Sequence, residues 1–197
     1  MINIKPLIAE LLGTFLLALV VTCMLGGAFP VPVAVMAGLA LGLGVYIFGG
    51  ISGAHLNPAI TLGLLAIKKV TMKDAGLYIV AQLIGGALAM MVVGELLTAP
   101  TLTVGTDHMI LLWEGLGAMV LALGVAAVVH GKTSQGSSGL VVGGALMLGI
   151  ALAVIGGTNG MLNPAVAIAT GSISLHYILG PIIGAVVGMF VYKHIAE

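Results

Sequence analysis

Six long apolar stretches, nearly free of charged residues, most constrain what this chain can fold into. They cover about residues 7–25, 31–50, 75–97, 109–130, 139–157 and 176–195. A helix needs about 20 mostly apolar residues to cross a bilayer. Only 6% of the residues are charged, whereas a soluble domain carries roughly a quarter charged residues to face water. The sequence therefore predicts an all-α membrane protein, with six transmembrane helices in one domain over residues 1–197.

The cationic residues are all lysines, and they follow the predicted spans in a regular way. If the N-terminus is cytoplasmic, every lysine falls on the cytoplasmic side: Lys5, Lys68, Lys69, Lys73, Lys132 and Lys193. Cytoplasmic loops carry an excess of Lys and Arg, so we expect a multi-pass protein of the cell membrane with both termini in the cytoplasm. A net charge of zero offers no basic face for nucleic acid.

Two shorter segments, about 51–70 and 156–172, are each interrupted by Asn-Pro-Ala. Asn57-Pro58-Ala59 and Asn163-Pro164-Ala165 are separated by a fixed offset (163 − 57 = 106). Glu10 and Glu114, which open the first helix of each half, have nearly the same offset (114 − 10 = 104). Each half, 1–100 and 101–197, thus contains three spans and one re-entrant segment, and three is odd, so the second half is inverted. Such repeats place a pathway at their interface near the midplane.

The Asn-Pro-Ala motifs predict two short helices. Asparagine is a strong N-cap and proline suits the first helical turn, so we expect helices to about Ala66 and Thr170. Inverted halves make them meet N-terminus to N-terminus, which disfavours cations and protons at the centre. The residues before each asparagine must be non-helical, and their carbonyls need a partner in protein or a wet lumen. We expect a ladder of carbonyl acceptors from Gly53, Ala54, His55, Asn159, Gly160 and Met161.

Glu10 and Glu114 are intramembrane carboxylates, which are costly in lipid unless they are paired. We expect each to accept hydrogen bonds from the backbone N–H groups of one non-helical loop and to hold the carbonyl ladder in place. A proton relay is the alternative interpretation. For His55, bracing of the first loop is favoured over proton sensing.

These residues resemble the aquaporin and aquaglyceroporin (major intrinsic protein) family across essentially the whole chain. The stretches that carry the resemblance are 52–59, 81–85, 163–165, 180–184 and the helix openings at Glu10 and Glu114. The resemblance implies an hourglass channel in each protomer, usually in a homotetramer. Such a channel passes water, glycerol or similar small neutral solutes passively.

One position departs from the pattern of the family. Its second motif is almost always followed by arginine, which forms a narrow outer filter, and this chain has Val166 there. The resemblance places the other filter positions at Ala37, Ala151 and Gly160. Because all four are small and uncharged, we expect a wider, more apolar constriction, although an apolar ring can also dewet and close.

Three classes of function therefore compete, with the passive channel first. An ion-coupled secondary transporter shares inverted repeats and broken helices, but it usually needs ionisable groups at the midplane. A non-conducting, structural or junction-forming protein is favoured if the four filter residues collapse onto one another. We expect no enzyme, cofactor or metal site, because the sequence shows no nucleophile–base pair, metal cluster or phosphate-binding loop.

Overall fold

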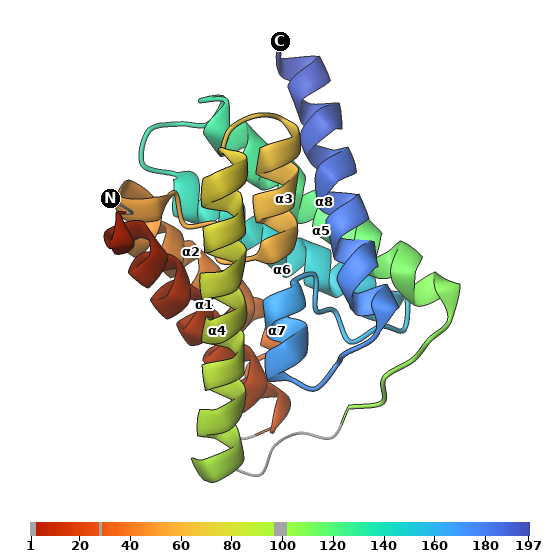
Figure 1. Ribbon diagram of the computed structural model, residues 1–197. Coiled ribbons are helices and arrows are strands. Elements are labelled where there is room, and N and C mark those ends of the chain that lie inside the picture. The colour runs from red at the N-terminus through yellow and green to blue at the C-terminus, as the bar shows by residue number, and fades with distance from the viewer. Residues whose placement is uncertain (1–2, 28, 97–101) are drawn as a thin grey trace.

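The computed structural model is built of eight α-helices over the residues that it describes, 3–27, 29–96 and 102–197 (Figure 1). Six are long: α1 (Ile4–Leu25), α2 (Val33–Ser52), α4 (Met72–Leu96), α5 (His108–Val129), α6 (Ser138–Ile155) and α8 (Leu175–Ala196). Two are short: α3 (Pro58–Ala66) and α7 (Pro164–Ala169). All six long helices are long and apolar enough to cross a membrane, so the predicted spans and half-helices are confirmed.

Two helices begin three residues before the apolar spans that predicted them, because polar groups cap them further out. The side chain of Asn3 accepts a hydrogen bond from the N–H of Lys5 and starts α1 at Ile4. At α4, the Thr71 hydroxyl accepts from the N–H of Asp74 at 3.1 Å. Hydropathy marks only the part of a helix that lies in hydrocarbon, whereas caps decide where the helix begins. Residue 97, the predicted end of the third span, lies outside the described residues.

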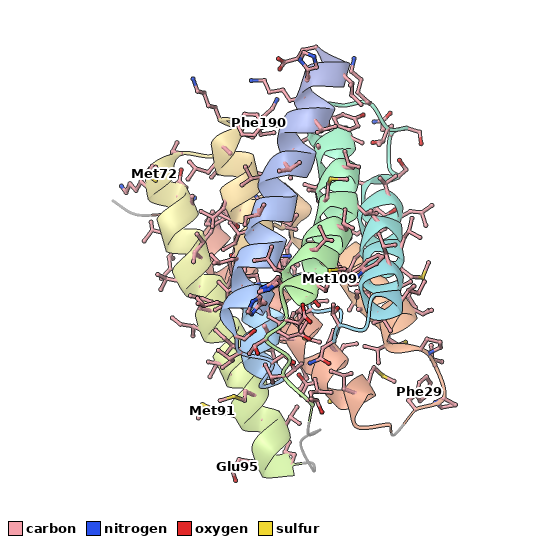
Figure 2. All side chains as sticks on the ribbon, turned by 90° about the vertical axis from the view of Figure 1, so that its right-hand side faces the viewer. Phe29, Met72, Met91, Glu95, Met109 and Phe190 are labelled. Carbon is pink, nitrogen blue, oxygen red and sulfur yellow. The ribbon has the colours of Figure 1, made fainter. Side chains whose placement is uncertain are left out.

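The outer surface of the bundle is apolar over most of its height. Leu39 and Leu148 are 63% and 62% exposed, and Ile183 is 50% exposed. Side chains of this kind cover the flank of the bundle between Met72 at one end and Glu95 at the other (Figure 2). Such a surface suits lipid, since a soluble protein seldom exposes contiguous apolar area on this scale.

The order long, long, short, long occurs twice along the chain, with opposite orientation. In Figure 1, α3 fills the upper half of the bundle and α7 the lower half, and both termini lie at the upper end. Each short helix packs against the last long helix of the other half, α3 against α8 and α7 against α4. The two halves therefore interlock. The predicted boundary between them, at residues 100 and 101, lies outside the described residues.

The lysines gather at one end of the bundle, which we call the lysine end. They occupy the first turns of α1 and α4, the segments after α3 and α5, and the last turn of α8: Lys5, Lys73, Lys68, Lys69, Lys132 and Lys193. Because these helix ends all lie at the upper end in Figure 1, the lysine end is also the end of both termini.

Close helix contacts occur where glycines face one another. A Cβ atom at Gly38 would lie 2.7 Å from the carbonyl oxygen of Gly143, so α2 and α6 touch through their backbones. A Cβ atom at Gly184 would clash with the carbonyl oxygen of Gly115, which brings α5 and α8 equally close. Small residues allow this approach in membranes, where van der Waals packing drives helix association.

Candidate functional site

Each short helix begins at an Asn-Pro pair whose asparagine side chain caps it. Asn57 Oδ1 accepts from the N–H of Ala59 at 2.8 Å, and Asn163 Oδ1 accepts from the N–H of Ala165 at 3.0 Å. The proline that follows each asparagine occupies the first turn, where its missing N–H leaves no helical hydrogen bond unmade. The motif thus determines locally where both helices start.

The same two asparagines join the halves of the molecule. Asn57 Nδ2 donates to the carbonyl oxygen of Leu162 at 2.9 Å, and Asn163 Nδ2 donates to that of Leu56 at 2.9 Å. Because each leucine directly precedes the opposite asparagine, the N-termini of α3 and α7 face each other (Figure 1). Each side-chain amide has two N–H groups, so one of them remains for another partner.

The carboxylate of Glu10 is fully buried and accepts four hydrogen bonds. Its Oε1 accepts from Ser52 Oγ at 2.6 Å and from the N–H of His55 at 2.9 Å. Its Oε2 accepts from the N–H of Leu56 at 2.7 Å and from Gln82 Nε2 at 2.8 Å. Two backbone donors of the loop before α3 are therefore satisfied by one side chain of α1.

Glu114 has the equivalent position in the second half and holds the loop before α7. Its Oε1 accepts from Thr158 Oγ1 at 2.7 Å and from the N–H of Met161 at 3.1 Å. Its Oε2 accepts from the N–H of Leu162 at 2.8 Å. Over the described residues no side-chain amide donates to Glu114, so the two carboxylates differ by one donor.

Ser52 and Thr158 complete these networks, and the sequence analysis did not single them out. Each hydroxyl donates to a glutamate and also accepts from its own loop, Ser52 from the N–H of Ala54 and Thr158 from that of Gly160, both at 3.0 Å. Their spacing equals that of the asparagines (158 − 52 = 106). This repeated offset is the signal that could have found them.

Leu56 and Leu162 adopt a backbone conformation that non-glycine residues rarely use. Their φ angles are 49° and 51°, and such left-handed residues cost on the order of 1–3 kcal/mol each. Both side chains are fully buried, and each fills the space beside a glycine, Leu56 at Gly13 and Leu162 at Gly117. The bonds to Glu10 and Glu114 and this packing hold the strained loops in place.

A cavity of about 420 Å³ runs from the end opposite the lysines to the centre of the bundle. Its lining includes Ala37, Ala151, Gly160 and Val166, and also Asn57 and Asn163. We call it the outer cavity. Among the described residues, its wall has no Asp, Glu, Lys or Arg and is mostly apolar. The few polar side chains that line it are His55, Asn57, Thr158, Asn159 and Asn163.

A second cavity of about 380 Å³, the inner cavity, opens at the lysine end beside Lys69 and Asp74. His55 lines both cavities. Its Nδ1 lies 3.2 Å from Thr61 Oγ1, and its ring meets that of Tyr78 edge-on with centroids 5.1 Å apart. The imidazole is therefore held in one orientation at the boundary between the cavities.

The expected carbonyl ladder belongs to residues that line these two cavities. Within the described part of the chain, no hydrogen bond reaches the following carbonyl oxygens: Gly53, Ala54, His55, Asn159, Gly160 and Met161. Backbone carbonyls in a membrane need a partner in protein or in water. Glu10 and Glu114 line neither cavity.

Comparison with known proteins supplies the deciding observation. The sequence profile of the family described as "Major intrinsic protein" matches residues 1–192. The chain belongs to the major intrinsic protein family. Its paired Asn-Pro-Ala motifs, inverted halves and central cavities are those of a membrane channel for water and small neutral solutes.

Relatives of this major intrinsic protein come from several kinds of organism. "Aquaporin AqpM" of Methanothermobacter thermautotrophicus is 30% identical over 98% of this chain and 98% of its own length. "Glycerol uptake facilitator protein-like 6" of Lactiplantibacillus plantarum is 34% identical over 94% of this chain and 95% of its own. The X-ray structure of the aquaglyceroporin from Plasmodium falciparum has a TM-score of 0.68 at 19% identity, covering 98% and 96% of the two chains. The last match shows that the fold is shared.

Proposed function

We propose that this protein is a passive channel with a wide, apolar outer filter, which admits neutral solutes larger or less polar than water and catalyses no reaction. The filter consists of Ala37, Ala151, Gly160 and Val166. One observation carries this proposal: all four line a single cavity that continues past them to the central asparagines. Three of them have no side-chain atom beyond Cβ, so they narrow the lumen little.

The charges around the lumen favour neutral solutes over ions. The positive ends of α3 and α7 face each other at the centre and disfavour cations. An ion-coupled transporter needs an ionisable partner in the pathway, but Glu10 and Glu114 are buried, accept hydrogen bonds from the loops and line neither cavity. The asparagine amides and free carbonyls instead offer donors and acceptors to small hydroxyl-bearing molecules.

Solute flux into proteoliposomes tests the proposal for wild type and Val166→Arg. Light scattering after rapid mixing would compare the fluxes of water, glycerol and one larger polyol. We expect wild type to pass the polyols. The arginine side chain reaches into the outer cavity and adds a cation, so the variant should keep water flux and lose most polyol flux.

Val166→Met is the matched control, because methionine lengthens the side chain without adding charge. If Met and Arg reduce polyol flux equally, the width of the filter matters and its charge does not. A wild-type protein that passes water but no polyol would contradict the proposed passage of solutes larger than water. If liposomes that contain the wild-type protein show the same flux as empty liposomes for every solute, a non-conducting role is favoured instead.

We further propose that the protein lies in the cell membrane with its lysine end in the cytoplasm, as a homotetramer. The gathering of all six lysines at one end supports the orientation, because positively charged segments remain in the cytoplasm. Membership in the family supports the tetramer, and light scattering of the purified protein measures the number of copies. A monomer in mild detergent and in lipid would contradict it.

A further inference from the structure

The outer and inner cavities meet along a short boundary. The residues that line both are Ala54, His55 and Val125. Ala54 and His55 belong to the loop before α3, and Val125 belongs to α5. A solute that crosses the molecule must pass between them, and we call this passage the inner neck.

The two cavities meet at the inner neck, whereas the outer filter lies within one of them. Val166 lies on the same continuous cavity as Val154 on its outer side and Asn57 and Asn163 on its inner side. Neither the filter positions nor the asparagine pair therefore divides the void. The outer cavity meets the inner cavity where Ala54, His55 and Val125 line both of them.

Two walls of the inner neck are held firmly, which suits a size limit. His55 Nδ1 is 3.2 Å from Thr61 Oγ1 and its ring contacts Tyr78. Tyr78 Oη donates to the carbonyl oxygen of Ser52 at 3.0 Å, which ties the end of α2, just before the loop, to α4. The N–H of His55 is bound to Glu10. Val125, which also lines the neck, is β-branched and has little rotamer freedom in a helix.

We infer that the inner neck, with Val125 as its specificity-determining residue, sets the upper size limit of the solutes that pass. This inference rests on the proposed function, since a narrow outer filter would make a second limit redundant. With the outer filter wide, discrimination moves to the next narrow point. The wall of that point includes the braced His55 imidazole and the apolar side chain of Val125, so it passes small solutes that need few hydrogen bonds at once.

A series of polyols that grow by one CHOH unit tests the inference: glycerol, erythritol, xylitol and sorbitol. The proteins are wild type, Val125→Ala and Val166→Ala, reconstituted as full chains into liposomes. Both variants remove the same atoms, one at the inner neck and one at the outer filter. We expect Val125→Ala to raise the flux of the first excluded polyol severalfold, and Val166→Ala to raise it much less.

A narrowing variant and a control keep the result independent of folding. Val125→Phe should lower glycerol flux severalfold, opposite in sign to Val125→Ala, which general misfolding would not produce. Val120→Ala, also on α5 but absent from the walls of both cavities, should match wild type. Helical circular dichroism and size-exclusion profiles confirm that each variant is folded.

The outcomes separate this inference from the proposed function. If Val166→Ala shifts the upper size limit of the polyols and Val125→Ala does not, the inference about the inner neck is overturned, while the proposed permissive channel stands. If wild type stops at water and Val125→Ala gains glycerol, the permissive function fails but the inner neck is supported. If neither Val125 variant changes any flux of a conducting protein, the inference is wrong.

Discussion

Glu10 and Glu114 show at the scale of single residues how a membrane protein holds non-helical backbone. In lipid no water satisfies a loop N–H group, so one buried carboxylate accepts from two of them in each half. The strained Leu56 and Leu162 persist because these bonds determine their conformation. The same carboxylates are therefore supports of the channel wall and lie outside its lumen.

Replacement of Glu10 by alanine tests this support. Four donors would lose their acceptor, and a buried unsatisfied donor costs about 1–3 kcal/mol. We expect Glu10→Ala to lower the free energy of unfolding by at least about 3 kcal/mol, measured by denaturant titration in mixed micelles with circular dichroism.

Glu95→Ala is the matched control for that loss of charge. Glu95 is exposed near the end of α4, and no hydrogen bond of its side chain is present in the described residues. Its replacement should change stability by less than about 0.5 kcal/mol. Equal effects at Glu10 and Glu95 would refute the supporting role.

At the scale of helices, backbone contacts through glycine determine which helices pair. Gly38 and Gly143 join α2 to α6, and Gly115 and Gly184 join α5 to α8. The long helices are apolar on all sides, so hydrophobicity does not choose the packing face, whereas small residues let backbones approach.

Gly184→Ala should therefore destabilise the bundle. The added methyl group would meet the carbonyl oxygen of Gly115, and overpacking of this kind costs about 1–3 kcal/mol. Thermal unfolding followed by circular dichroism measures the loss. Gly94→Ala is the control, since a Cβ atom there meets nothing within 4 Å. A helical alanine should stabilise α4 slightly, so equal losses at Gly94 and Gly184 would contradict the packing argument.

The helices themselves could be predicted with few errors, because lipid imposes a minimum apolar length on each span. The starts of α3 and α7 were also predictable, since Asn-Pro carries its own capping chemistry. The early starts of α1 and α4 were missed because the caps at Asn3 and Thr71 lie outside the apolar stretches.

At the scale of the whole molecule, inversion brings both termini and all the lysines to one end while the cavities meet inside. This arrangement predicts the sidedness of the protein in a cell. An epitope tag after Glu197 should be protected from added protease in intact cells and become accessible after the cells are broken.

A second tag placed before Met1 should behave in the same way, because six spans return the chain to its starting side. A tag in the segment between α1 and α2 should show the opposite accessibility. Opposite behaviour of the two terminal tags would mean an odd number of spans and would contradict the fold.

The sequence by itself determined the six spans, the inverted repeat, the two short helices and the resemblance to a channel family. Each of these follows from local chemistry or from a repeated offset. It also indicated Glu10 and Glu114 as candidate loop supports, because a carboxylate within a span needs a partner.

Only the tertiary structure decided which residues face the lumen and where the lumen narrows. In a soluble helix an apolar stripe identifies the inner face, but here lipid and core are both apolar, so periodicity does not separate Val125 from a lipid-facing valine. The bonds of Ser52 and Thr158 to the glutamates join residues far apart in the sequence. The inner neck of Ala54, His55 and Val125 likewise exists only because the fold brings a loop of one half against a helix of the other.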